Sequence, residues 1–304
     1  YTTRNYPCLE IASTYLVAED SLIGESPLDL QVAVVGSTTL DRVVMEGGAT
    51  YLKWGGVPVY AGLTFSRSGV ATGVCTNVSA RDHAVVDLLS NASLSVDTGY
   101  SQATTEFVNH VDGDHRLQEL YARAAPISAP QLTAIAAKVG HVHLGPLHPR
   151  DIDPEALPAL HNVGLVSIDI QGYVRRIEGT DILPGVSEHL TAALEQADIV
   201  KASRDELEEV KTFYGAELEA IMRNYGLEQW LITEGKEGGW LLDSSGRRHE
   251  FQAIPVEECV DPTGAGDVFF AAYLTQHVYQ KKEIDVALKQ AGTAAARQIE
   301  GKLI

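Results

Sequence analysis

Short apolar runs rich in β-branched residues recur along the chain and alternate with stretches of helical periodicity. These runs lie at Gln31–Ser37, Val139–Leu144, Val163–Ile170, Ile199–Ala202 and Trp230–Thr233. Between some of them, Ala129–Lys138 and Glu188–Ala197 carry apolar residues at spacings of three and four. A continuous apolar run suits a strand buried on both faces, and the wider spacing suits an amphipathic helix. The alternation predicts a doubly wound α/β fold with a mostly parallel sheet.

One region breaks this alternation and predicts a small, separate β element. The extended runs Thr104–Val111 and Asp114–Tyr121 flank Asp112-Gly113. Asp-Gly between two extended runs is a strong signal for a two-residue hairpin turn, because glycine adopts positive φ at little cost. Arg42–Trp54 is a further extended piece, interrupted by glycines. Polar and apolar residues mix on both faces of these segments, as expected for a lid over a cleft or for a dimer contact.

The predicted domain organisation follows from these two patterns. We expect one α/β domain at residues 31–304, with a β lid contributed by about 42–56 and 98–125. Residues 1–30 show weak periodicity, and we interpret them as an N-terminal extension.

Composition and charge narrow the classes of function. The 304 residues are 45% hydrophobic and 21% charged, which is typical of a globular protein. Acidic residues number 41 against 23 basic ones, for a formal net charge of −18. The pairs Arg247-Arg248 and Lys281-Lys282 are isolated, and there is no dense basic cluster. Because such a surface repels phosphate backbones and anionic lipids, we expect no nucleic-acid or membrane partner.

The cysteines indicate a reducing compartment. Cys8, Cys75 and Cys259 are odd in number and far apart, and no CxxC pair occurs. No apolar run approaches the length of a membrane span, which takes about 18 residues. We therefore expect a cytoplasmic protein.

The segment Val260–Leu274, VDPTGAGDVFFAAYL, carries the most chemistry. Its small residues Gly264, Ala265 and Gly266 let the backbone approach a ligand and direct several N–H groups at one point. The apolar run that follows is helical in character, so its positive dipole end falls at the same place. The segment predicts an anion hole at a helix N-terminus.

Asp267 follows the last of these glycines and lies in the predicted first helical turn. A carboxylate there can accept a proton from a hydroxyl held beside the anion hole, so that the hydroxyl meets a phosphoryl group in line. The alternative for an isolated GAGD is a helix cap with an acidic first turn.

The full segment closely resembles the signature of the ribokinase-like (PfkB-type) carbohydrate kinases, DTxGAGDxF followed by a helix. Pro262 replaces the second residue of the pattern. The matching residues are Asp261, Thr263, Gly264, Ala265, Gly266, Asp267 and Phe269. The resemblance extends from about Gln31 onward. It implies a three-layer α/β/α sandwich with a mostly parallel central sheet and a small β-sheet lid.

The resemblance also implies an acceptor site. Asp41, at the end of VVGSTTLD, matches an aspartate that binds substrate hydroxyls through hydrogen bonds. Without the resemblance, an aspartate at this position would be interpreted as a turn residue. Gly55 and Gly56 match a Gly-Gly pair that packs against the substrate. Tyr60 stands where the family commonly has an asparagine that helps to hold the sugar.

Two stretches are similar to plant-type myo-inositol kinases of this family. One is Val166–Arg175, with the form D-x-Q-x-x-x-R, and the other begins at Lys201 with KASRDE. They favour a sugar or polyol acceptor, inositol among the candidates. Phe107 and Asn109 of the lid would close over it. Arg175 is a candidate to meet an anionic group, with a surface ion pair as the alternative.

On the donor side, the resemblance implies ATP and Mg²⁺. Glu206 matches a glutamate that supports Mg²⁺ through water, although an exposed acidic helix is the alternative. The implied nucleotide-lining residues are Lys201, Ser203, Thr233, Gly235, Gly238 and Gly292. Asp261 and the carbonyl of Thr263 match positions that bind a monovalent cation such as K⁺ in some relatives.

The resulting hypothesis is an ATP-dependent kinase that transfers the γ-phosphoryl group to a hydroxyl of a sugar or polyol, with Asp267 as general base. The family also implies a homodimer formed through the lid. Two alternatives stay open: a nucleoside kinase of the same family, and a catalytically silent binding protein on this scaffold. No GxxxxGK[ST], strand-linked GxGxxG or GxSxG occurs, which disfavours P-loop kinases, dinucleotide-binding enzymes and α/β-hydrolases.

Overall fold

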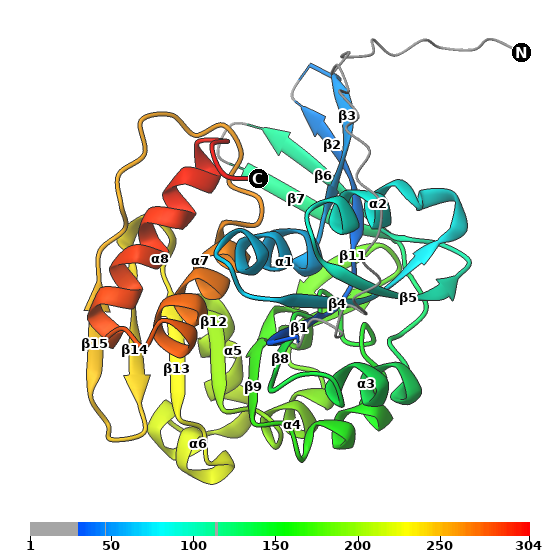
Figure 1. Ribbon diagram of the computed structural model, residues 1–304. Coiled ribbons are helices and arrows are strands. Elements are labelled where there is room, and N and C mark those ends of the chain that lie inside the picture. The colour runs from blue at the N-terminus through cyan, green and yellow to red at the C-terminus, as the bar shows by residue number, and fades with distance from the viewer. Residues whose placement is uncertain (1–29, 46, 113–114) are drawn as a thin grey trace, which may run out of the picture.

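The chain folds into a large layered body and a smaller sheet that stands beside it (Figure 1). This computed structural model describes residues 30–304 except 46, 113 and 114. The predicted extension at residues 1–30 therefore lies almost wholly outside the described residues, as does Cys8.

The body is built on a nine-stranded sheet with the order β15-β14-β13-β12-β9-β8-β1-β4-β5. Its strands are β1 (Val32–Val35), β4 (Thr72–Ser79), β5 (Ser95–Ser101), β8 (His141–Leu144), β9 (Leu165–Asp169), β12 (Ile199–Ser203), β13 (Gln229–Thr233), β14 (Gly239–Asp243) and β15 (Arg248–Phe251). The strands from β13 to β5 run parallel, and β14 and β15 extend the β13 edge in antiparallel fashion.

Helices cover both faces of this sheet. They are α1 (Val57–Arg67), α2 (Ala84–Asn91), α3 (Ala129–Ala136), α4 (His189–Leu194), α5 (Arg204–Tyr214), α6 (Leu218–Tyr225), α7 (Ala265–Leu274) and α8 (Ile284–Ile299). Short turns complete the list: η1 (Ala80–Asp82), η2 (Pro154–Leu160), η3 (Ile170–Val174), η4 (Gly235–Glu237) and η5 (Thr275–Tyr279).

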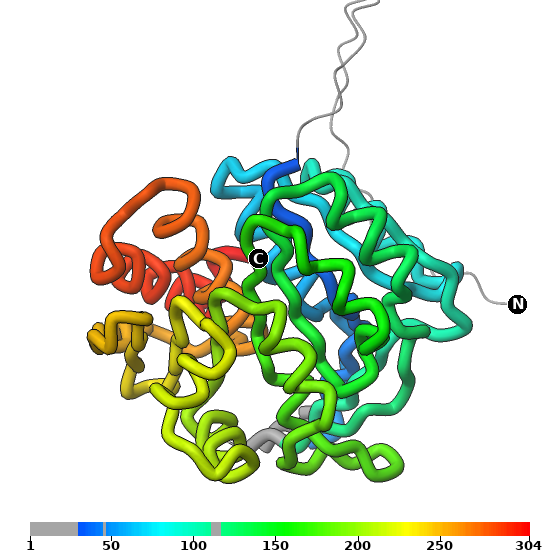
Figure 2. The backbone as a smooth tube through the Cα atoms, turned by 90° about the horizontal axis from the view of Figure 1, so that it is seen from below, coloured from blue at the N-terminus to red at the C-terminus, as the bar shows by residue number. Residues whose placement is uncertain are grey.

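Alternate residues of the central strand β1 join two separate cores. Val32 and Val34 pack with α1, α2, α7 and α8, whereas Ala33 and Val35 pack with α3, α4, α5 and α6. Figure 2 shows the green to yellow helices of the second layer in front. Because both faces are covered, every residue of β1 is buried. The expected three-layer α/β/α sandwich is confirmed.

The five predicted apolar strands are confirmed as β1, β8, β9, β12 and β13, and the two predicted helices as α3 and α4. The sequence pattern missed β4, although all of its residues are buried. Its TGVCTNVS segment mixes small and polar residues with valine, so no continuous apolar run marks it. Part of the range assigned to the lid, residues 98–101, belongs to β5 and pairs with β4.

The lid is a six-stranded sheet with the order β10-β11-β7-β6-β2-β3. Its strands are β2 (Thr39–Met45), β3 (Thr50–Gly55), β6 (Thr105–Asp112), β7 (His115–Ala122), β10 (Arg175–Glu178) and β11 (Asp181–Pro184). The sequence pattern missed β10 and β11, which are short and rich in charge. Three excursions of the chain form the lid, and each leaves from the carboxyl end of a body strand: β1, β5 or β9.

The hairpin predicted at Asp112-Gly113 is present in the pairing of β6 with β7, which ends at Asp112 and His115. Its turn lies outside the described residues. The lid has two unlike faces. Asp41, Phe107 and Gln118 line a cavity on the inner side. Leu52, Leu117 and Tyr121 are exposed, and strand register places them on the opposite face, with the ion pairs Arg42–Glu106 and His110–Glu119 between them. None of the helices in the described part of the chain is long and apolar enough to cross a membrane.

Candidate active site

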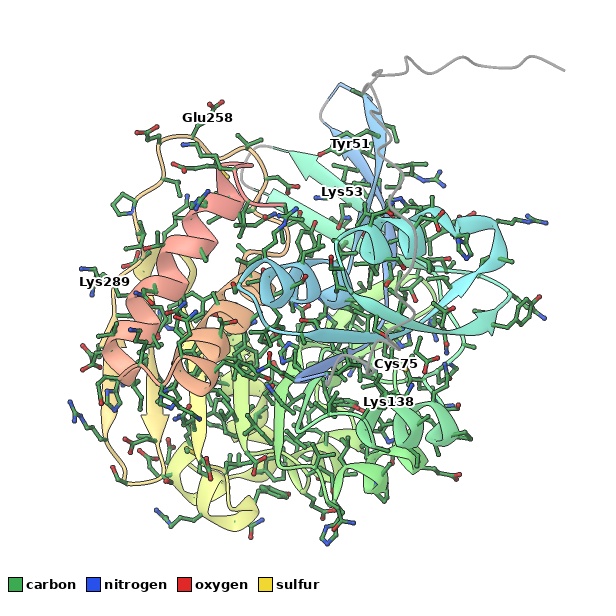
Figure 3. All side chains as sticks on the ribbon, in the orientation of Figure 1. Tyr51, Lys53, Cys75, Lys138, Glu258 and Lys289 are labelled. Carbon is green, nitrogen blue, oxygen red and sulfur yellow. The ribbon has the colours of Figure 1, made fainter. Side chains whose placement is uncertain are left out.

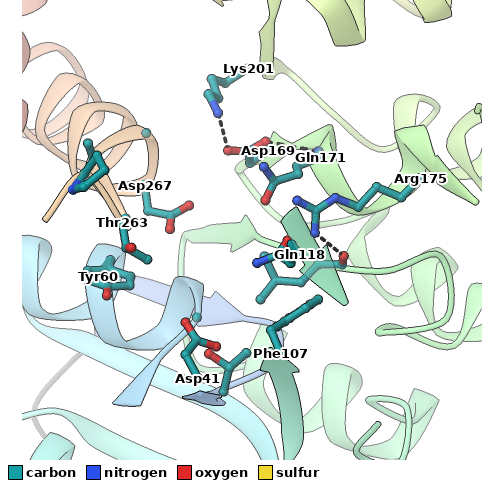
Figure 4. Close-up of a pocket in the computed structure, with 17 residues that line it drawn as sticks. Asp41, Tyr60, Phe107, Gln118, Asp169, Gln171, Arg175, Lys201, Thr263 and Asp267 are labelled. Carbon is teal, nitrogen blue, oxygen red and sulfur yellow. Dashed lines mark hydrogen bonds and ion pairs between the residues drawn. The ribbon is translucent and has the colours of Figure 1, made fainter. Parts of the chain in front are cut away.

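A cavity of about 380 Å³ lies between the lid and the N-terminus of α7 (Figure 4). The residues that line it are Thr39, Asp41, Gly56, Tyr60, Phe107, Gln118, Leu147, Asp169, Gln171, Arg175, Lys201, Pro262, Thr263, Gly264, Ala265, Gly266 and Asp267. The structure thus brings the predicted anion hole, the predicted base and most of the predicted acceptor residues around one space.

The loop before α7 has the backbone shape expected of an anion hole. Gly264 is the N-cap of α7 and has a φ of 75°, in the left-handed region that favours glycine. A Cβ atom there would lie 2.2 Å from Cγ of Tyr60, so any larger residue would displace the tyrosine ring. The helix that follows is buried from Val268 to Leu274. A buried apolar helix therefore fixes the direction of the N–H groups at its first turn.

Asp267 points into the cavity from the first turn of α7 (Figure 4). Burial raises the pKa of this carboxyl, the negative charge of Asp169 adds to the rise, and the resulting pKa is about 7. The positive charges of Lys201 and Arg175 oppose the rise without cancelling it. A carboxyl with a pKa near neutrality is well suited to take a proton in one step and release it in the next.

Lys201 and Asp169 lie opposite each other on the adjacent strands β12 and β9 and form a buried ion pair. Lys201 Nζ lies 2.7 Å from Asp169 Oδ2, and both side chains are less than one-tenth exposed. Burial alone would lower the pKa of Lys201, but Asp169, Glu206 and Asp267 together raise it. A Cβ on Gly266 would lie 3.2 Å from Lys201 Nζ, so the ammonium lies beside the glycine loop. The anion hole thus includes a permanent positive charge.

The acceptor side is formed by the lid and the start of α1. Asp41 is buried on β2, and a Cβ on Gly55 would lie 2.9 Å from its Oδ2. Gly56 has a φ of 86°, and a Cβ there would lie 2.1 Å from the carbonyl oxygen of Ser37. Gly55 and Gly56 therefore leave room for Asp41 and for the entry into α1; Gly56 lines the cavity and Gly55 does not.

Asn109 does not line the cavity. Its Oδ1 accepts a hydrogen bond of 2.9 Å from Nε2 of Gln118, and Gln118 is the residue that reaches the cavity. Phe107 lines it as expected. The lid contact predicted at Asn109 is thus made through its neighbour on β7, because β6 and β7 present paired residues on the same face.

Asp169, Gln171 and Gln118 are cavity residues that sequence reasoning did not select. For two of them the signal was present, since Asp169 and Gln171 open the D-x-Q-x-x-x-R stretch that ends at Arg175. Arg175 also lines the cavity, and its Nη1 donates a hydrogen bond of 2.9 Å to the carbonyl of Leu147.

Four of the predicted nucleotide residues are described but do not line this cavity: Thr233, Gly235, Gly238 and Gly292. Thr233 ends β13, and Gly235 and Gly238 bound the following turn. At Gly292, a Cβ would lie 3.2 Å from Cγ1 of Ile254, so this isoleucine packs against α8 there.

Ser203 and Glu206 form a capping box at the start of α5. Glu206 Oε2 accepts from the Ser203 backbone at 2.7 Å, and Ser203 Oγ accepts from the Glu206 backbone at 3.3 Å. Neither residue lines the cavity, but the charge of Glu206 acts on both Lys201 and Asp267. Glu206 therefore lies close enough to influence the anion hole while one of its oxygens serves the helix cap.

Lys53 of the lid reaches the loop that precedes the anion hole (Lys53 is labelled in Figure 3). Its Nζ lies 2.5 Å from Oδ2 of Asp261, whose Oδ1 accepts from the Thr263 backbone at 2.9 Å. Burial opposes ionisation of Asp261, but Lys53 and Thr263 outweigh it and lower the pKa. The carbonyl of Thr263 accepts from Gln298 at 3.1 Å. Both groups predicted to bind a monovalent cation are thus engaged within the chain.

Comparison with known proteins gives a match over most of the chain. A family model described as pfkB family carbohydrate kinase matches residues 88–302. A cytidine kinase from Thermococcus kodakarensis is 24% identical over 277 residues, covering 81% of this chain and 87% of that protein. A fructokinase from Escherichia coli is 39% identical over 88 residues, and that match spans only 28% of each chain.

Solved structures share the fold over nearly the whole described chain. A pyrophosphate-dependent kinase in the ribokinase family, complexed with a pyrophosphate analog and myo-inositol, is 25% identical, with a TM-score of 0.77. The match covers 89% of this chain and 95% of that one. Arabidopsis thaliana ribokinase complexed with ribose and ATP is 20% identical, with a TM-score of 0.69 and coverage of 90% and 93%.

Proposed function

Because this chain belongs to the pfkB family of carbohydrate kinases, we propose that it phosphorylates a hydroxyl group of a ring polyol, with myo-inositol as the first candidate. The observation that carries the proposal is the position of Asp267, which lies in one cavity with the glycine loop and the acceptor-side residues of the lid.

In the proposed reaction, Asp267 accepts the proton of the acceptor hydroxyl. The hydroxyl oxygen then attacks the phosphorus, and the bond from phosphorus to the bridging oxygen of the donor breaks. The N–H groups of Gly264, Ala265 and Gly266, with Lys201, stabilise the negative charge that develops on the transferring phosphoryl group. The lid covers the cavity and limits competition by water.

The polarity of the acceptor side supports a ring that carries several hydroxyl groups. Asp41, Gln118, Gln171 and Arg175 provide both acceptors and donors, and Phe107 provides an apolar wall. A carboxylate accepts from two neighbouring hydroxyls at once, which suits a vicinal diol. The relative crystallised with myo-inositol adds support at 25% identity.

The donor is either ATP or pyrophosphate, and a specific observation supports each. ATP is favoured by the TEGKEGG turn after β13, which resembles a nucleotide-lining turn. Pyrophosphate is favoured because the cavity includes the glycine loop and Lys201 but none of Thr233, Gly235 and Gly292, all of which are described. The structural relatives that depend on pyrophosphate point the same way.

The two metal ions proposed from the resemblance differ in how well the residues fit them. Glu206 fits Mg²⁺ held through water, because its carboxylate lies close enough to act on Lys201 and Asp267, and Mg²⁺ usually keeps several of its waters. Bound there, Mg²⁺ would neutralise charge on the donor phosphates. A monovalent cation does not fit at Asp261, since Lys53 already places an ammonium against that carboxylate.

A homodimer through the lid is part of the proposal. Leu52, Leu117 and Tyr121 expose 58%, 66% and 66% of their surface on the outer face of one sheet. Large apolar side chains exposed on one face of a sheet favour a surface that another copy covers.

The test is a matrix of two donors and several acceptors. Wild type and Asp267→Asn are assayed with Mg·ATP or Mg·pyrophosphate and with inositols, hexoses and nucleosides. We expect turnover with a cyclic polyol that is lost in the variant. Turnover restricted to nucleosides would select the nucleoside-kinase alternative, and donor binding without any turnover would select the silent binding protein.

A further inference from the structure

A second cavity, of about 350 Å³, lies beside the first, and four arginines line it. We call it the arginine cavity. Arg123, Arg150, Arg175 and Arg176 line it together with His148 and His189, and Glu188 is the only carboxylate residue in its wall among the described residues. It lies where β10 of the lid meets the segments that follow β8 and β11. The chain has a net charge of −18, so this cavity is a local region of positive charge on a protein that is negative as a whole.

Three of these arginines, Arg123, Arg150 and Arg176, are weakly neutralised by the described residues. In the part of the chain that the structure describes, Arg123 and Arg150 make no ion pair. Arg123 has one long contact, 3.5 Å from Nη2 to the carbonyl of Gly179. Arg176 pairs with Glu178 at 2.9 Å, but both side chains are more than half exposed, so the pair contributes little. The positive potential of the cavity is therefore available to a ligand.

A buried histidine lies in the wall of the same cavity. His148 is 2% exposed, and its Nδ1 accepts from the Arg150 backbone at 3.2 Å. In the neutral ring the proton therefore resides on Nε2. Burial lowers the pKa of His148, and Arg123 and Arg175 act in the same direction against the opposing charge of Asp151. Nε2 lies 3.4 Å from Asp151 Oδ1 and has no hydrogen-bond partner among the described residues.

We propose that the arginine cavity is a binding site for a phosphate monoester group carried by a small molecule. Guanidinium groups present paired N–H donors that match phosphate oxygens, and several converging arginines select a doubly charged group over a single carboxylate. This site is distinct from the anion hole at Gly264–Gly266, which receives the transferring phosphoryl group.

The phosphate group has two sources that the structure allows. Arg175 lines both cavities, so a phosphate substituent on the acceptor itself reaches from the first cavity into the second. A separate phosphorylated metabolite that regulates the kinase fits the same groups. A phosphate on the acceptor would refine the proposed function and rests on it. A separate regulatory metabolite would not depend on which acceptor the kinase uses.

The binding test uses the full chain and inorganic phosphate as the probe. Titration calorimetry compares wild type with Arg123→Ala/Arg150→Ala and with the control Arg223→Ala/Arg297→Ala, which removes the same charge from exposed positions on α6 and α8. We expect wild type and the control to bind phosphate at two sites, the anion hole and the arginine cavity. The cavity variant should retain only the anion hole, with affinity at the lost site reduced at least about tenfold.

Equal stoichiometry and affinity in all three proteins would overturn the proposal. Turnover of a neutral acceptor in the absence of phosphate reports folding, because Arg123 and Arg150 lie outside the first cavity and should leave that turnover unchanged. Should the double variant not fold, Arg150→Glu alone provides the same comparison, since Arg150 is exposed and makes no ion pair with any described residue.

Kinetics with phosphorylated compounds separate the two sources. If an inositol monophosphate or glucose 6-phosphate is itself phosphorylated, with a KM that rises about tenfold in the cavity variant, the group belongs to the acceptor. If the compound is not consumed but changes kcat or KM for a neutral acceptor only in wild type and control, it is a separate effector. A failure of kinase activity with every acceptor would count against the proposed function, whereas the phosphate titration would still decide the site.

Discussion

The body sheet and the lid sheet differ in burial and in the kind of residue that each contributes to the cavity. Both faces of the body sheet are covered, and β1 is buried along its whole length. Its strands carry charges that must be held in place before the reaction, such as Lys201. The lid has one face on the cavity, with Asp41 and Gln118, and another that exposes Leu117. We infer that the body determines how fast phosphoryl transfer proceeds and that the lid determines which acceptor is held.

The largest expected effect comes from the body. In Asp267→Asn the amide cannot accept the hydroxyl proton, so kcat should fall by about 10³-fold. Binding of donor and acceptor, measured by calorimetry, should persist because the cavity keeps its shape. A kcat within threefold of wild type, roughly the scatter of context effects, would remove Asp267 from the role of base.

Changing Asp41 on the lid should alter binding instead of rate. Asp41→Asn loses the charge in its hydrogen bonds to the acceptor, so KM should rise about tenfold to a hundredfold while kcat changes little. Steady-state kinetics measures the split. Glu119→Gln, on the outer face of β7, is the matched control and should behave like wild type. A fall in kcat with unchanged KM in Asp41→Asn would contradict the division between the sheets.

The outer face of the lid can be tested through the oligomeric state. Leu117→Glu replaces an exposed apolar side chain of this face with a charge, so the dissociation constant of the dimer should rise about tenfold or more. Light scattering over a concentration series measures it. Leu88→Glu, at an exposed leucine of α2, is the control. A wild type that is monomeric at every concentration would refute the dimer.

The pH profile tests the charges of the body. A base must be ionised, so kcat/KM should rise with pH and level off above the pKa of about 7. Asp169→Asn removes a negative charge that raises this pKa and leaves the positive charge of Lys201 less compensated. Both changes lower the pKa of Asp267, and the rising limb should move to lower pH by roughly one unit. Asp205→Asn, exposed on α5, should leave the limb in place.

The smallest expected effect concerns the ion pair that joins the lid to the body. Wild type should be as active in choline as in K⁺, because Lys53 supplies the positive charge at Asp261. Lys53→Met should lose up to about fivefold in kcat/KM and should regain it in K⁺. Lys53→Arg serves as the control that keeps the charge. Activation of wild type by K⁺ would show that the lysine does not replace the cation.

Sequence patterns predicted the features that depend on neighbouring residues. The apolar run at Val32–Val35 and the glycine loop at Gly264–Gly266 are local, and both lie where expected. The strand Thr72–Ser79 escaped because burial between helices tolerates threonine and asparagine, whose polar groups find partners only in the fold.

Pairs that are distant in sequence could not be predicted in this way. Asp169 and Lys201 are 32 positions apart, and only the adjacency of β9 and β12 brings them to 2.7 Å. The same holds for Arg123 and Arg150, which form no cluster in the sequence and meet in a cavity through the fold. The net charge of a chain therefore describes the average charge of its surface and does not reveal local clusters of opposite charge that the fold brings together.

The way the lid is threaded into the chain limits how its specificity can be changed. Its strands come from three excursions, Thr39–Gly55, Thr105–Ala122 and Arg175–Pro184, and each departs from and returns to the body. No single cut releases the lid, so it cannot be transplanted between relatives as a cassette. In a chimera that receives one of these segments from a relative, the new strands must pair with lid strands that evolved beside a different segment. New acceptors are therefore more accessible through point substitutions on the inner face than through exchange of segments.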